Sequence, residues 1–194
     1  MRGRPRGFDR TAALEQALHE FWRHGYEATS VAGLTQAMGI APPSLYAAFG
    51  DKRRLFTEVV GRYADTYGQY GRRSLTEPTA RAAVERMLHE AAAEYTNASH
   101  PPGCLVINGA VNTTPGDESV KSELRRYRDA TKQALAQKIR ADVKAGRLPK
   151  RTDSAALATF YSAVIQGMST QACDGASHAD LERMVAIAMT AWPD

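Results

Sequence analysis

Cysteine is scarce in this sequence, which has only Cys104 and Cys173 among its 194 residues. Neither belongs to a CxxC motif or to a group of Cys and His residues at metal-ligand spacing. The sequence therefore predicts no disulfide framework and no metal site. Two free thiols are what we expect of a protein in the reducing cytoplasm.

Long hydrophobic runs are missing as well. No stretch approaches the ~18 consecutive apolar residues of a membrane-spanning helix. The basic start of the chain, MRGRPRGFDR, leads into an amphipathic segment and not into the apolar core of a signal peptide. We therefore expect no contact with a membrane and a cytoplasmic location.

The ionisable residues give little sign of catalysis. The five histidines are scattered, and Glu85 and His89 form only one helical i, i+4 pair, which is common by chance. No set of nucleophile and base stands out. The sequence thus predicts no enzyme, no catalytic residue and no cofactor, and a structural helical adaptor is the remaining alternative to a binding function.

The net charge is only +4, but it is unevenly distributed. Residues 1–73 hold 11 Lys and Arg against 7 Asp and Glu, whereas the rest of the chain is neutral. A basic N-terminal region attracts a polyanion such as nucleic acid and speeds the encounter with it. Chance scatter is the alternative reading of so small an excess.

The spacing of apolar residues predicts an all-α fold of about nine helices with no sheet. The first helix starts after Asp9 and ends at Gly25, and the last starts after Ser177. Residues 104–112 are ambiguous between strand and helix, and we interpret them as a helix because no partner strand is visible. The other expected helices are residues 30–38, 42–49, 52–73, 79–96, 117–145 and 153–172.

Residues 29–56 have the pattern of a helix-turn-helix, in which two short helices are joined by a tight turn at Gly39. Such a motif lays its second helix in the major groove of DNA, while the first crosses the backbone. Three short core helices are the alternative. The side chains predicted to contact duplex DNA are Thr29, Ser30, Pro43, Ser44, Tyr46 and Lys52.

The N-terminal arm alternates arginine with glycine and proline, a composition that cannot pack into a core. Arg4 and Arg6 are therefore predicted to enter the adjacent minor groove. Residues 1–8 are thus expected to form a flexible basic arm of the DNA-binding domain, and a disordered solubilising tail is the alternative.

Residues 8–60 resemble the TetR/AcrR family of bacterial transcriptional repressors. The resemblance rests on FWRHGYEATS, GI, LYAAF and DKRRLF, which follow the order and spacing of the family. It implies a homodimer that binds a palindromic operator and is released by a small-molecule inducer, with residues 1–51 binding DNA and 52–194 binding ligand and partner. Ala48 and Arg53 depart from the family pattern, which leaves the operator sequence open.

The C-terminal half contains candidates for a ligand pocket and a dimer surface, with simple core packing as the alternative for both. The predicted pocket residues are Tyr63, Tyr67, Tyr95, Cys104, Asn108, Tyr127 and Tyr161, which favour a small, partly apolar inducer without strong charge. The predicted dimer residues are Leu157, Phe160, Val164, Met168, Leu181, Met184, Val185 and Ala188.

Cys104 has a second interpretation. It follows Pro-Pro-Gly and is expected at a helix N-terminus, where the pKa of a thiol falls and its reactivity rises. The protein could then sense oxidants or electrophiles through Cys104, whereas a buried small hydrophobe is the plainer alternative.

Overall fold

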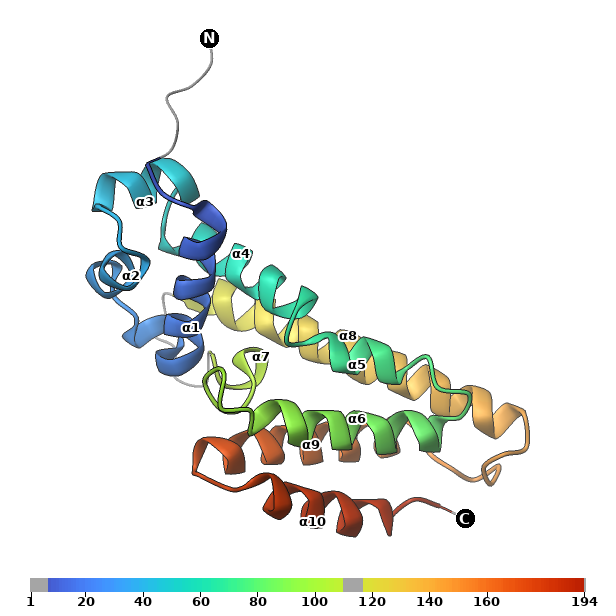
Figure 1. Cartoon of the computed structure of the whole chain (residues 1–194). Helices are drawn as coiled ribbons and strands as arrows, with labels where there is room; N and C mark the ends of the chain where they lie inside the picture. Colours follow the sequence, from blue (N-terminus) through green and yellow to red (C-terminus); the bar gives the residue numbers. More distant parts are fainter. Residues whose placement is uncertain (1–6, 110–116, 194) are drawn as a thin grey trace.

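The computed structural model describes residues 7–109 and 117–193, and helices are the only regular elements in these two ranges (Figure 1). The all-α prediction is confirmed, with ten helices in place of about nine. They are α1 (Arg10–Ala28), α2 (Val31–Met38), α3 (Pro42–Phe49), α4 (Lys52–Asp65), α5 (Gln69–Ser74), α6 (Ala80–Tyr95), α7 (Leu105–Asn108), α8 (Glu118–Lys144), α9 (Ser154–Cys173) and α10 (His178–Met189).

The additional helix comes from a break in the segment 52–73, which the sequence predicted to be continuous. The chain leaves the helical path between Asp65 and Gln69, and the N–H of Gly68 donates to the carbonyl of Tyr63 at 2.8 Å. A Cβ atom at Gly68 would lie 3.3 Å from the Cα of Ala64. Glycine therefore permits a tight turn here that a larger residue would resist.

Helices α1, α2 and α3 form the part of the molecule that we call the head. Aromatic and aliphatic side chains from α1, α2 and α3 bury themselves against α4 because each helix carries an apolar stripe at helical spacing. The fully buried residues of this core include Leu18, Phe21, Leu34, Leu45 and Phe56. Gly25 departs from helical geometry with φ 74°, as expected for a residue that ends the regular part of α1.

Helices α5 to α10 form the body, and α4 leads into it from the head (Figure 1). Four helices account for most of its packing, since α6 contacts α8, α9 and α10, and α8 lies against α9. Ser177 and Asp180 make the expected capping box at the start of α10. The segment 104–112 was interpreted as a helix, and its described part contains the short α7, whereas residues 110–112 lie outside the described ranges.

No helix within the described residues combines the length and the apolar character needed to cross a bilayer.

The ring of Phe56 makes a test of the head core. It is fully buried, with its centroid 5.0 Å from those of Phe21 and Tyr26. Phe56→Ala should lower the free energy of unfolding by ~3–5 kcal/mol, because it removes transfer free energy and leaves a cavity. Urea denaturation followed by circular dichroism measures this. Tyr46→Ala, at a half-exposed position on α3, is the control and should change stability by no more than ~0.5 kcal/mol.

Candidate DNA-binding face and ligand cavity

The helix-turn-helix begins at Ser30, whose hydroxyl accepts the N–H of Gly33 at 3.0 Å and so caps α2. Gly39 ends α2 in the left-handed conformation, with φ 64° and ψ 33°. The N–H of Ile40 then donates to the carbonyl of Thr35 at 3.1 Å, which turns the chain sharply into α3. Pro42 stands in the first turn of α3, where no backbone donor is needed.

Helix α3 buries one side and exposes the other. Leu45 and Phe49 face the core, while Pro43, Tyr46 and Ala47 face outward. Tyr46 is 51% exposed and is the most exposed tyrosine of the described residues. The exposed side is thus a short, rigid surface of the size that fits a DNA groove.

The other predicted DNA contacts differ in their exposure to solvent. Ser44 is half-buried and Ser30 is exposed. Thr29 is buried, and its hydroxyl donates to the carbonyl of Gly25 at 2.6 Å, so its side chain points into the head. Arg4 and Arg6 lie outside the described residues.

The Lys52 ammonium lies over the ring of Tyr26, 4.3 Å from its centroid. Burial lowers the pKa of Lys52, although Glu27 and Asp117 attract the cation. Arg54, which sequence reasoning missed, is the more exposed cation and lines a surface hollow together with Tyr46 and Ala47. The signal that could have indicated Arg54 is Gly50, four residues earlier, because a new helix starts soon after this glycine, at Lys52.

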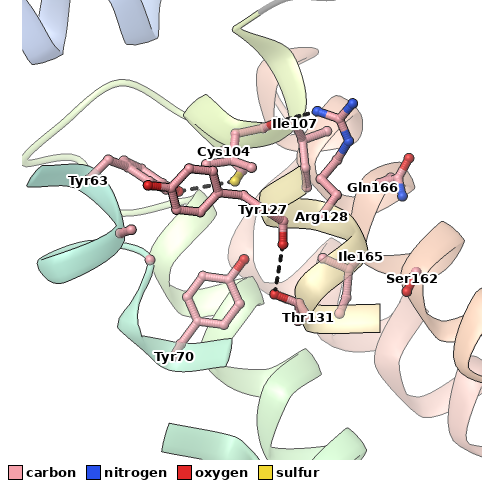
Figure 2. A pocket seen from close by; sticks show the side chains of 13 residues that line it. Tyr63, Tyr70, Cys104, Ile107, Tyr127, Arg128, Thr131, Ser162, Ile165 and Gln166 are labelled. Atoms are coloured by element: carbon pink, nitrogen blue, oxygen red, sulfur yellow. Dashed lines mark hydrogen bonds between the residues drawn. The ribbon is translucent and has the colours of Figure 1, made fainter. Parts of the chain in front are cut away.

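A cavity of about 120 Å³ lies in the body between α4, α5, α7, α8 and α9 (Figure 2). Of the seven predicted pocket residues, the structure brings together Tyr63, Cys104 and Tyr127. Sequence reasoning missed most of the wall, which also contains Ala64, Gly68, Tyr70, Val106, Ile107, Arg128, Thr131, Ser162, Ile165 and Gln166.

The other four predicted pocket residues have structural partners elsewhere. The Tyr67 hydroxyl donates to Glu15 at 2.6 Å, and the Tyr161 hydroxyl donates to the carbonyl of Ala188 at 3.1 Å. The side-chain amide of Asn108 donates a hydrogen bond to the hydroxyl of Ser169 at 2.9 Å. Tyr95 is buried behind the wall, with its hydroxyl 2.6 Å from that of Tyr70.

The eight predicted dimer residues also have different places in the structure. Met168, Leu181 and Val185 are buried inside the monomer, so they cannot form a contact surface. Phe160, Val164, Met184 and Ala188 line an open hollow between α9 and α10. Ile187, which was missed, is the most exposed large apolar residue of the described chain at 73%. Leu157 is half-buried beside a different hollow.

Comparisons with known proteins agree with this architecture. The family model of the tetR family of bacterial regulatory proteins matches residues 13–59, and that of the tetracyclin repressor-like C-terminal domain matches residues 80–187. The chain belongs to the TetR family.

Named relatives cover the whole chain. The HTH-type transcriptional repressor ComR of Escherichia coli (strain K12) is 35% identical over 195 aligned residues, which span 100% of this chain and 93% of ComR. The repressor BdcR of the same organism is 34% identical, over 97% of this chain and 90% of BdcR. A cysteine variant of the regulator CifR, solved in complex with 26-bp operator DNA, superposes with a TM-score of 0.93 at 42% identity, covering 98% of this chain and 100% of that one.

In this TetR-family chain, an aromatic cluster joins the head to the wall of the cavity. Trp22 of α1 stacks on His100 at 4.5 Å and meets the rings of Tyr63 and Tyr67 edge-on at 4.9 and 5.1 Å. Tyr63 lines the cavity, and its hydroxyl donates to the sulfur of Cys104 at 3.2 Å. A molecule in the cavity would therefore touch a residue that packs directly on the head.

Two further contacts attach the head and α4 to the body. The N–H of Tyr26 donates to the carbonyl of Gly109, after α7, at 3.0 Å. Arg53 pairs with the buried carboxylate of Glu123 on α8 at 2.6 Å. Arg53, a departure from the family pattern, thus attaches the start of α4 to the body.

The expectation of a lowered pKa at Cys104 is wrong. The residue does precede a helix, but α7 has only four residues and the thiol is buried. Burial raises the pKa of Cys104 above its ordinary value of 9.0, and the hydrogen bond from Tyr63 offsets this only in part. Among the described residues, no three His, Cys, Asp or Glu side chains are grouped in a way that would hold a metal ion.

His100 makes the aromatic cluster sensitive to pH. Burial of the imidazole opposes its charge, but Nε2 lies 3.1 Å from Glu94 and Nδ1 donates to the carbonyl of Pro101, so the pKa of His100 is raised above its ordinary 6.5. The folded state therefore binds the proton more tightly than the unfolded state. Its stabilisation is fully present below pH 6.5 and is lost as the pH rises through the raised value.

We expect the free energy of unfolding of the unmodified protein to exceed that of His100→Asn by a margin that shrinks from about pH 6 to about pH 8. Urea titrations of both proteins across this range measure the margin. A margin that is constant or grows with pH would contradict the paired, protonated state of His100.

Proposed function

We propose that this protein is a ligand-responsive transcriptional repressor, which binds a palindromic operator as a homodimer and is released by a small-molecule inducer. Residues 1–51 bind DNA, and residues 52–194 bind ligand and partner. The protein acts as a regulator and not as an enzyme, and it works in the cytoplasm, where the bacterial chromosome is. The observation that carries this proposal is the outward side of α3, on which Tyr46 stands half-exposed over a rigid core.

The chemistry of the head supports the DNA part of the proposal. Pro43 and Ala47 offer apolar contact to a thymine methyl group, and Ser44 can bond a base edge or phosphate. Tyr46, Ser30, Lys52 and Arg54 carry donors for phosphate oxygens, and Arg54 lines one hollow together with Tyr46. Gly7 and Phe8 line a hollow beside the start of α3, which supports a role of the preceding Arg4 and Arg6 in the neighbouring groove.

The dimer part rests on the apolar hollow between α9 and α10. Two recognition helices must stand roughly 34–36 Å apart to read adjacent half-sites of B-form DNA. Isologous packing of α9 and α10 against the same helices of a second chain would cover Phe160 and Ile187, which are exposed in the monomer. Helices α9 and α10 lie away from α3, which leaves the DNA-binding face open (Figure 1).

Release by an inducer requires that the ligand bind one conformation better than the other, with a coupling of ~1–3 kcal/mol. Tyr63 and Trp22 offer a direct connection from the cavity to α1. Burial of the Cys104 thiol gives no support to the alternative in which this residue senses oxidants or electrophiles.

A gel-shift titration with the promoter region of the gene itself tests the DNA part. Tyr46→Ala should weaken operator binding about ten-fold, because it removes a rigid contact without affecting the core. Lys52→Ala and Arg54→Ala should each reduce the slope of log K against log salt by about 0.9 if each cation neutralises one phosphate. Arg140→Ala, an exposed cation on α8, should leave the slope unchanged.

An unchanged slope in Lys52→Ala would mean that the Lys52 ammonium stays on the ring of Tyr26 and contacts no phosphate. If the protein fails to bind the promoter region at low salt, the proposed function is wrong.

The dimer surface has a separate test. Ile187→Asp should convert the dimer to monomers at micromolar concentration, because a carboxylate in an apolar interface costs several kcal/mol unless it is paired. Sedimentation velocity measures the change. Ala186→Asp introduces the same charge on an exposed position of α10 that does not line the hollow, and should leave the dimer intact. Dimers that persist in both variants would exclude this hollow as the interface.

A further inference from the structure

Arg128 is an unexpected member of the cavity wall. The buried apolar residues of α8 are Val120, Leu124, Leu135 and Ile139, which share one face of the helix. Arg128 falls in this same row, four residues after Leu124, where the stripe would continue with an apolar side chain. Its guanidinium therefore belongs to the inner side of α8, and Figure 2 shows it beside α7.

The charge of Arg128 has no acidic partner in the described ranges. Its Nη1 donates to the neutral carbonyl of Val106 at 2.6 Å. The adjacent carboxylate, Asp129, instead pairs with Lys132 at 3.0 Å and with Arg125 at 3.7 Å. Residues 110–116, AVNTTPG, contain no acid.

Half-burial imposes a cost on this unpaired cation. It lowers the pKa of the Arg128 guanidinium, although the charge of Asp129 opposes the effect. A guanidinium has five N–H donors in a planar fork, and the carbonyl of Val106 uses only one side of it. A carboxylate bound to the remaining donors would supply both hydrogen bonds and the missing counter-charge.

The remainder of the cavity limits what such a ligand carries. Val106, Ile107 and Ile165 form an apolar wall with the ring of Tyr63, and Gln166 and Ser162 add neutral polar groups at one side (Figure 2). A volume of about 120 Å³ is close to the roughly 150 Å³ of a protein cavity that accepts benzene. The space therefore suits one ring or a short aliphatic chain.

We propose that the cavity binds a small organic monocarboxylate, whose carboxylate pairs with Arg128 and whose apolar body packs against Tyr63, Ile107 and Ile165. The inference rests on the proposed function and names the class of its inducer. It replaces the expectation of a ligand without strong charge, because the predicted pocket residues did not include Arg128.

The position of Arg128 also gives the ligand a connection to the head. The guanidinium that would hold the carboxylate also donates to the carbonyl of Val106, which belongs to α7, so movement of the Arg128 side chain on binding would pull on α7. The carbonyl of Gly109, directly after α7, holds the N–H of Tyr26 in α1 at 3.0 Å. A shift of α7 on binding would thus act on the helix that supports the DNA-binding face.

The test is isothermal titration of the full chain with benzoate and hexanoate, each compared with its neutral amide, and with inorganic phosphate. We expect at least one carboxylate to bind about ten-fold or more tightly than its amide, because only the carboxylate gains charge-assisted hydrogen bonds. Phosphate should not bind measurably. Equal binding of acid and amide, no binding of either acid, or tighter binding of phosphate would each overturn the proposal.

Arg128→Gln should remove the preference for the carboxylate, and Arg128→Lys, which retains the charge without the fork, should retain part of it. Arg125→Gln is the matched control, because this arginine lies on the same helix with its side chain 75% exposed. An unchanged preference in folded Arg128→Gln, verified by circular dichroism, would contradict the assigned role.

The gel shift separates this inference from the proposed function. If the protein binds its promoter region but shows no preference for a carboxylate, the repressor function stands and only the proposed ligand class is wrong. If the protein binds carboxylates through Arg128 but does not bind DNA, the ligand class is correct and the repressor function is wrong. When both are correct, the binding carboxylate weakens the gel shift of the unmodified protein and leaves that of Arg128→Gln unchanged.

Discussion

The packing of α1 against α4 is the contact on which both halves of the molecule depend. Phe56 of α4 completes the core beneath the helix-turn-helix, while Tyr63, two turns further along the same helix, forms part of the cavity wall. A close-packed core transmits small shifts because it has few voids in which to absorb them. Any displacement of α4 therefore changes the support of α3 and the shape of the cavity together.

Two contacts with different chemistry accompany α4 across this junction. The aromatic cluster of Trp22, Tyr63 and His100 is apolar and close-packed, whereas Tyr26 and Gly109 meet through one backbone hydrogen bond. In the proposed response to a ligand, the first would transmit displacement of a cavity wall, and the second would transmit displacement of α7. A ligand with contacts to both Tyr63 and Arg128 would bias both, and the size of its effect is limited by its preference for one conformation.

Two half-buried arginines, Arg53 and Arg128, mark the places where the body is specialised. Arg53 and Glu123 neutralise each other at the junction, so their burial is compensated and their role is attachment. Arg128 has no such partner among the described residues, and an uncompensated cation next to an empty volume favours an anion. The contrast between these two arginines distinguishes a structural ion pair from a binding group.

Local sequence determined most of the helices and the helix-turn-helix. Caps at Ser30, Gly39 and Ser177 act through backbone groups within a few residues, so they can be read without knowing the fold. The apolar stripes likewise determined which side of each helix is buried. The break at Gly68 escaped prediction because it depends on contacts with Tyr63 and Ala64 that form only when the chain turns there.

Only the tertiary structure decided what lies against each buried side. Periodicity cannot distinguish a stripe that faces a cavity from one that faces another helix. The sequence therefore grouped tyrosines of both kinds as pocket residues, whereas in the structure Tyr161 and Tyr67 pack against other helices and Tyr63 and Tyr127 line the cavity. The same limit applies to Met168 and Ile187, of which one is core and the other surface. Distances along a helix are fixed by its backbone, but the neighbours across it come from remote parts of the chain.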